Sequence, residues 1–170
     1  MRNKNYKHNN KTFAYSITIL ITLVGFATLL FPFFLARTFP SSNLVALITT
    51  FPFFFINILG GIFLIYFIIT GVYYQSIIID NYIAEMKSQR TITGIFSKQK
   101  NILEMPKNKI LKYAFYTRPF TFNTTLMIKV RLSKTKTLAK RFKLSFLSKK
   151  QKRRIEKILD KVLEKNSVNG

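Results

Sequence analysis

The chain has 170 residues, a formal net charge of +22 from 28 Lys and Arg against six Asp and Glu residues, and no cysteine. The absence of cysteine excludes disulfides, thiolate metal sites and cysteine nucleophiles, and the single histidine, His8, leaves almost nothing for a histidine metal site. Residues 71–170 hold 23 basic and six acidic residues, a surplus of 17, so this part of the chain is expected to meet an anionic partner.

The N-terminal part of the chain combines a basic start with two long apolar runs. Residues 1–12 are expected to form a basic cytoplasmic tail in which His8 is solvated. The runs that follow, residues 13–36 and 44–69, each exceed the roughly 20 residues that an α-helix needs to cross a bilayer. The sequence therefore predicts a transmembrane helical hairpin over residues 13–75. Two core helices of a soluble protein are the alternative, but 170 residues cannot cover both helices on all sides.

Basic residues are distributed unevenly around the apolar runs. Four precede the first run, Arg37 alone lies between the runs, and most others follow the second. The positive-inside rule therefore predicts a multi-pass protein of the cell membrane with both termini in the cytoplasm. A cleaved signal peptide is the competing interpretation, because the basic start, the apolar run and Phe34-Leu35-Ala36 resemble its three regions. That alternative would carry the basic C-terminal half across the membrane, against the charge bias.

Small and polar residues recur within both predicted helices. At matched depth in an antiparallel pair, Thr22 and Gly25 come level with Gly61 and Gly60, and small residues there allow close helix packing. Asn57, near the midplane, needs a hydrogen-bond partner such as a backbone carbonyl or a threonine hydroxyl. These five residues are the predicted hairpin-packing set. A polar transport path is the weaker interpretation, because one Asn and no buried charge make a poor ion route.

Residues 76–170 change to short segments rich in Ile, Tyr, Phe and Thr, the pattern of β-strands. No Gly/Ser or Pro linker separates them from the second apolar run, so a small cytoplasmic domain is expected beside the bilayer. The predicted strands are Ile77–Met86, Thr91–Phe96, Asn101–Met105, Ile110–Tyr116, Thr124–Leu132 and Leu138–Leu147.

The last segment has helical spacing. Ser148 precedes Gln151 by three residues, the pattern of a capping box, and apolar residues then recur every three or four positions. An amphipathic helix is predicted over residues 149–165. Its first turn, residues 149–154, is strongly basic and is a second candidate for binding an anion.

The order of these elements resembles the bacterial pleckstrin-homology-like small membrane proteins. The resemblance rests on a hairpin followed by Thr91-Ile-Thr-Gly-Ile-Phe96, Ile102-Leu-Glu-Met-Pro106 with Lys109-Ile110, and Phe142-Lys-Leu-Ser-Phe-Leu147 before the helix. A polar insertion at residues 116–123 and the unusual basicity depart from the common form. The resemblance implies a mainly-β domain capped by a C-terminal helix, acting as a membrane-tethered interaction module in the bacterial inner membrane, and it transfers no catalytic residue.

Two predicted strands near the C-terminus alternate apolar and basic residues. If they pair antiparallel with their apolar sides inward, their basic side chains share the other face, because strand side chains have a period of two. In the simplest register Arg131 faces Arg141 and Lys129 faces Lys143, so the face is most stable when anions cover it, although water and salt could also screen it. The predicted anion-binding residues are Lys129, Arg131, Lys134, Lys136, Arg141 and Lys143.

Several functions fit this pattern. The first is a non-enzymatic membrane-anchored scaffold whose basic domain engages anionic membrane lipids or an acidic protein. The second is a small accessory subunit of a transport or secretion complex, in which the hairpin packs against larger membrane subunits. Nucleic acid is a weaker candidate because no base-reading motif occurs. An enzyme is the least favoured class, since the acidic residues are scattered and no phosphate loop or hydrolase elbow is present, and no cofactor is expected.

Overall fold

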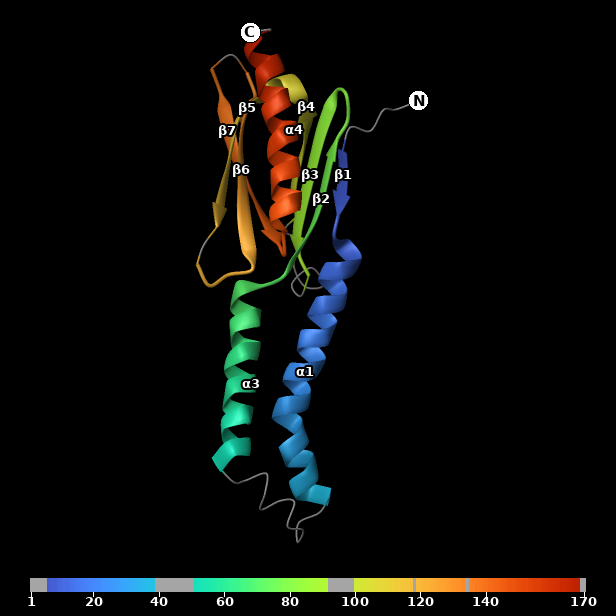
Figure 1. Cartoon of the computed structure of the whole chain (residues 1–170), viewed down its shortest axis with the longest axis vertical. Helices are drawn as coiled ribbons and strands as arrows, with labels where there is room; N and C mark the ends of the chain where they lie inside the picture. The colour runs from blue at the N-terminus through green and yellow to red at the C-terminus, as the bar shows by residue number, and fades with distance from the viewer. Residues whose placement is uncertain (1–5, 39–50, 92–99, 118, 134, 169–170) are drawn as a thin grey trace. The chain divides into compact units, whose positions relative to one another are not determined.

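The computed structural model describes residues 6–38, 51–91, 100–117, 119–133 and 135–168 (Figure 1). The chain forms two compact units. One contains Met1–Ala14 together with Val72–Gly170, and the other contains Tyr15–Gly71. The first is called the β unit and the second the helical unit.

The helical unit is built from two apolar helices, α1 (Lys11–Thr38) and α3 (Phe51–Thr70). Large apolar side chains are exposed along both, as with Leu23 at 63% and Leu59 at 60%. Among the described residues, Lys11–Leu30 is the one helical stretch long and apolar enough to cross a membrane, and Asn57–Thr70 is a shorter apolar stretch. The second predicted span begins at residue 44, outside the described residues, so the two-span hairpin stays a prediction.

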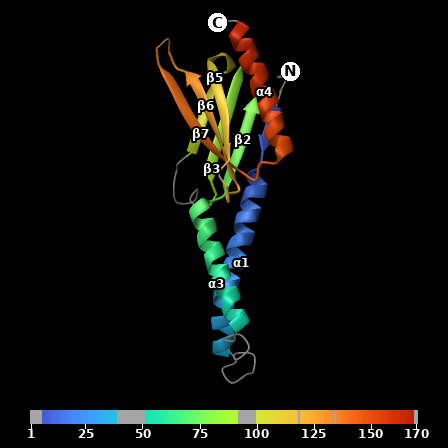
Figure 2. The ribbon, with the colours of Figure 1, turned by 60° about the vertical axis from the view of Figure 1, so that its left-hand side comes forward.

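The β unit contains two antiparallel sheets and a C-terminal helix (Figures 1 and 2). This confirms the predicted mainly-β region that ends in a helix. Sheet A has the strand order β1-β2-β3-β4, and sheet B has the order β5-β6-β7. The bounds are β1 Tyr6–Asn9, β2 Tyr73–Ile79, β3 Ile83–Arg90 and β4 Lys100–Pro106; then, after the short helix η1 (Lys107–Lys109), β5 Ile110–Thr117, β6 Asn123–Arg131, β7 Thr137–Ser145 and α4 Lys149–Val168.

Strand β1 differs from the expected N-terminal tail. It pairs with β2 and places Tyr6 opposite Ile79 and His8 opposite Ile77. Nε2 of His8 lies 3.2 Å from Nε2 of Gln75, and burial lowers the pKa of the imidazole below its ordinary value. The prediction of a tail with a solvated His8 is therefore wrong, because Tyr6–Asn9 form a strand and His8 is half-buried. Their partner strand is more than sixty residues away in the sequence, so the local pattern carries no trace of the pairing.

One predicted strand divides into two. Ile77–Met86 contains a turn after β2, where the backbone N–H of Asp80 donates to the carbonyl of Ile83 at 2.9 Å. Ile79 and Ala84 face each other across the resulting hairpin and are both buried. Most of the predicted strand Thr91–Phe96 lies outside the described residues. The other four predicted strands correspond to β4 to β7 within about two residues at each end.

The core lies between the two sheets and α4 (Figure 2). Its apolar residues come from β2, β3, β4, β5, β6, β7 and α4, and Ile155 and Leu159 of the helix are fully buried. The capping box that starts α4 is confirmed: Ser148 N–H donates to Oε1 of Gln151 at 2.9 Å, and Gln151 N–H donates to Oγ of Ser148 at 3.2 Å. Helix α4 thus covers the apolar core and does not cover the outer face of sheet B.

Candidate functional site

The register of β6 and β7 determines which basic residues of sheet B are neighbours. Leu126 lies opposite Phe142, and Arg131 lies opposite Thr137. The predicted register, with Arg131 facing Arg141, is therefore wrong. A tight connection fixes the observed pairing, because the N–H of Leu132 donates to the carbonyl of Lys136 at 2.9 Å. Turn length, rather than the apolar pattern, chooses among registers that all bury the same side chains.

The predicted sharing of one face is preserved in the observed register, because the two registers differ by an even number of residues. Leu126, Ile128, Val130, Phe142 and Leu144 point into the core and are buried. The alternate positions point outward. Lys129, Arg131, Arg141 and Lys143 are exposed there, Lys136 is exposed in the β6–β7 connection, and Lys134 lies outside the described residues.

Sequence reasoning missed Lys112 of β5. It is exposed and lies directly opposite Lys129 across the β5–β6 pair, next to an irregularity in the β5 register. Arg141 is a diagonal neighbour of Lys129, at roughly 7–8 Å between such positions in a sheet. In a regular strand Lys112 would lie on the same side as the buried Ile110, so strict alternation predicts the wrong side for it, and the irregularity between the two residues moves Lys112 to the outer face. We call Lys112, Lys129, Arg131, Arg141 and Lys143 the cationic face.

No acidic residue neutralises the cationic face from within sheet B. The sequence contains no Asp or Glu between Glu104 and Glu156, so all three strands lack one. Nζ of Lys143 instead lies 3.2 Å from the Tyr73 hydroxyl and 5.2 Å from the centre of that ring. A cation over an aromatic ring keeps its full charge. The face therefore presents a positive field to solvent.

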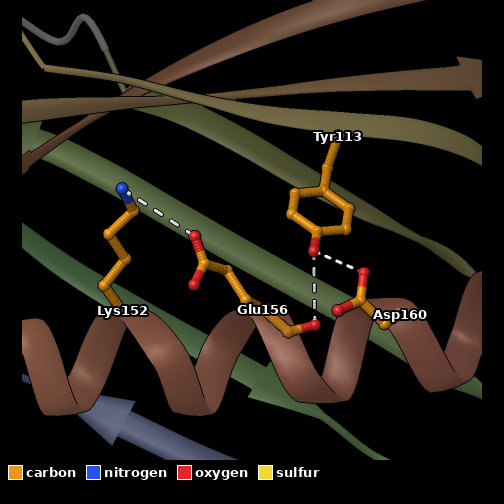
Figure 3. A network of polar contacts seen from close by, with 4 residues as sticks. All are labelled: Tyr113, Lys152, Glu156 and Asp160. Atoms are coloured by element: carbon orange, nitrogen blue, oxygen red, sulfur yellow. Dashed lines mark hydrogen bonds and ion pairs between the residues drawn. The ribbon is translucent and has the colours of Figure 1, made fainter.

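Two carboxylates of α4, those of Glu156 and Asp160, make polar contacts on the other side of sheet B. The hydroxyl of Tyr113 donates to Oδ1 of Asp160 at 2.5 Å and lies 3.4 Å from the carbonyl of Glu156, whose carboxylate is 3.8 Å from Nζ of Lys152 (Figure 3). Burial and the Asp160 carboxylate raise the pKa of Tyr113 well above its ordinary value. These contacts attach α4 to β5.

A groove of about 860 Å³ lies at the end of the β unit where η1 precedes β5. Its lining includes Arg131 from the cationic face, but also Asp160 and Glu164. Asn166 beside it donates to the carbonyls of Lys107 and Ile110 at 2.8 and 2.9 Å. Mixed charge makes the groove a poor anion site. Within the described part of the chain, no three His, Asp or Glu residues gather as metal ligands do.

The predicted packing residues of the helical unit are displaced by about one helical turn from the expected pairs. A Cβ at Gly25 would lie 2.0 Å from Cδ1 of Leu64, and one at Gly60 would lie 2.6 Å from Oγ1 of Thr28. Gly61 has more room, since its nearest contact is 3.6 Å away on Leu29. The helices meet closely at Gly25 and Gly60, but not against each other as expected. Thr22 donates within its own helix to the carbonyl of Thr18, and Asn57 is half-buried.

No protein-family model, no curated protein and no solved structure matches this chain.

Proposed function

We propose that the protein is a membrane-anchored module whose helical unit crosses the cytoplasmic membrane twice, with both termini in the cytoplasm. The exposed apolar side chains along α1 and α3 support this topology, because such surfaces are stable in hydrocarbon and unfavourable in water. The charge distribution supports the orientation, since the β unit carries nearly all basic residues. The close contacts at Gly25 and Gly60 support pairing of the helices in a bilayer.

The β unit is proposed to have the pleckstrin-homology-like fold, with the hairpin inserted between its first two strands. In the described part of the chain, seven antiparallel strands divided four and three, followed by one helix that covers the core, support this assignment. Strand β1 is the reason that the count reaches seven. No step of catalysis is assigned to the protein, and its proposed role is binding.

The proposed ligand is the anionic lipid surface of the same membrane, bound by the cationic face. The observation that carries the proposal is the unneutralised positive charge on all three strands of sheet B, with Lys112 and Lys129 directly opposed. Opposed like charges destabilise a sheet by some tenths of a kcal/mol per pair. A nearby anionic bilayer reverses that effect, since each basic residue close to the headgroups gains on the order of 1 kcal/mol.

The test places one fluorescent label on the cationic face of the full chain. The protein has no native cysteine, so Ala139→Cys, an exposed position opposite Lys129, accepts a unique label. In proteoliposomes containing a trace of lipid with a nitroxide headgroup, quenching is compared between anionic and zwitterionic bilayers. The quenching in anionic bilayers divided by the quenching in zwitterionic bilayers is called the lipid-charge ratio at position 139. We expect a ratio of several-fold that falls toward one as salt is raised.

Two variants with the same loss of charge decide the site. One carries Lys129→Gln, Arg131→Gln, Arg141→Gln and Lys143→Gln, and the other carries Lys149→Gln, Lys150→Gln, Arg153→Gln and Lys157→Gln on exposed positions of α4. The first should bring the lipid-charge ratio close to one, and the second should leave most of it. The opposite ranking would move the site to the basic start of α4. A ratio of one in the unchanged chain would exclude lipid and favour an acidic protein partner.

A further inference from the structure

The connection between β5 and β6 presents an apolar surface that the binding role does not explain. We call residues 119–122 the aromatic loop. Phe120 is 94% exposed, and Phe122 is 47% exposed. Phe120 also has a φ of 58°, in the left-handed region where glycine and asparagine are favoured and a bulky side chain is strained. A large apolar side chain that is exposed in a strained backbone conformation is a candidate for contact with an apolar environment outside the protein.

One set of contacts places the aromatic loop beside the point where the chain leaves the β unit for α1. The rings of Phe122 and Phe146 stack at 5.4 Å between centroids, and Phe146 meets the ring of Phe13 edge-on at 5.9 Å. The N–H of Phe146 donates to the carbonyl of Phe122 at 3.0 Å. Phe13 lies in the first turn of α1, and the chain passes into the helical unit after Ala14.

A second set of contacts places the same loop beside the point where the chain returns. Asn123 follows the loop directly, and its Oδ1 accepts a hydrogen bond from Oγ of Ser145. The same Oγ accepts a hydrogen bond from the N–H of Tyr73 at 2.7 Å. Tyr73 begins β2 one residue after Val72, where the β unit resumes. Both crossings between the units therefore flank the aromatic loop.

We propose that the aromatic loop inserts into the headgroup and upper acyl region of the bilayer that α1 enters. This inference rests on the proposed membrane anchoring and adds a second, non-spanning contact with the membrane. Aromatic side chains are stable at that depth, and an exposed apolar surface near the points where the chain leaves and re-enters the β unit is one that the membrane interface accepts. The loop then fixes the orientation of the β unit and so determines which part of the cationic face reaches the headgroups.

The test uses three single-cysteine variants of the full chain in liposomes, each with a polarity-sensitive label. Phe120→Cys reports on the loop, and Thr135→Cys is the matched exposed control in the connection at the opposite end of β6. Leu23→Cys, on an exposed position of α1, reports whether the chain is in the bilayer at all. Nitroxides sit at the top of the lipid acyl chains in one sample and near their ends in another.

We expect the label at position 120 to be quenched several-fold more than the label at position 135, and by the shallow nitroxide in preference to the deep one. If position 23 is quenched by the deep nitroxide while positions 120 and 135 behave alike, the loop does not enter the membrane and the anchoring stands. If position 23 is not quenched either, the anchoring proposal fails and the loop proposal fails with it.

A second measurement separates membrane contact from a structural role of Phe120. With the label moved to Thr117→Cys, an exposed position at the end of β5, Phe120 is replaced by Gly or by Trp. Phe120→Gly should reduce shallow quenching severalfold while leaving the melting temperature of the protein unchanged or higher, because it relieves the left-handed strain. Phe120→Trp should retain the quenching. Equal quenching in all three chains, or a fall in melting temperature with Gly, would overturn the proposal.

Discussion

The outer faces of the two sheets differ in the signs of the charges that they carry. On sheet A, Glu85 lies directly opposite Glu104, and Lys87 forms an ion pair with Glu85 that raises the pKa of the ammonium. Lys7 is exposed on β1, at the edge of the same sheet and separated from β3 by β2. Positive and negative charges are thus mixed on this face and neutralise each other in place. The outer face of sheet B has only positive charge.

This difference shows that the high net charge is not a uniform property of the surface. If basicity served solubility alone, the few acidic residues would be expected on either sheet. Instead the acidic residues near the sheets lie on sheet A and on α4, where Asp160 accepts a hydrogen bond from Tyr113. This distribution supports the proposal that the cationic face binds an anionic partner.

The largest expected effect comes from making sheet B resemble sheet A. Lys129→Glu with Arg141→Glu changes the local charge by four units and places a carboxylate opposite Lys112. We expect the lipid-charge ratio at position 139 to fall to one or below, because the face no longer attracts anions. The melting temperature of the β unit should not fall, since opposed like charges become opposite charges.

The reciprocal change on sheet A is the control for this prediction. Glu85→Lys with Glu104→Lys makes that face positive without touching sheet B. The lipid-charge ratio at position 139 should then stay near its original value. A similar loss in both double variants would mean that the net charge of the protein, and not the cationic face, attracts the lipid.

An intermediate effect on the lipid-charge ratio is expected when basic residues at different distances from the aromatic loop are neutralised. Lys143 lies two residues from Ser145, which contacts Asn123 at the root of the aromatic loop. Arg131 lies eight residues along β6 from Asn123, roughly 26 Å at about 3.3 Å per residue. Lys143→Gln should therefore lower the lipid-charge ratio more than Arg131→Gln does. Equal effects would show that the aromatic loop does not orient the face.

The pattern of the sequence predicts much of the β unit but not the arrangement of its charges. The alternation in β6 and β7 predicts which side chains face outward, and Ser148 with Gln151 predicts the start of α4, because both are local periodicities. The register depends on the turn closed by Leu132 and Lys136, whose hydrogen bonds no apolar pattern encodes.

Long-range pairings are the other features that the sequence could not supply. Strand β1 forms because it pairs with the edge of β2, although the residues of the helical unit separate the two strands in the sequence. The offset of Gly25 and Gly60 depends on Leu64 and Thr28, whose side chains fill the space opposite each glycine. The left-handed backbone of Phe120 is unpredictable for a different reason, because its residue type argues against that conformation.

The smallest expected effect concerns stability alone. Lys112→Thr removes the charge directly opposite Lys129 and leaves a residue with good β-propensity at an exposed position. The free energy of unfolding should rise by some tenths of a kcal/mol at low salt, and the gain should shrink as salt screens the pair. Lys7→Thr on the exposed side of β1 is the matched control and should give no comparable gain. Chemical denaturation in detergent at two salt concentrations measures both.

The most direct test of the contrast between the faces compares one label on each sheet in the same bilayers. Ile102→Cys lies at an exposed outward position of sheet A, and Ala139→Cys lies on the cationic face of sheet B. As the fraction of anionic lipid is raised, quenching by the headgroup nitroxide should increase several-fold at position 139 and change little at position 102. Parallel increases at both positions would contradict the claim that the cationic face of sheet B is the part of the protein that binds anionic lipid.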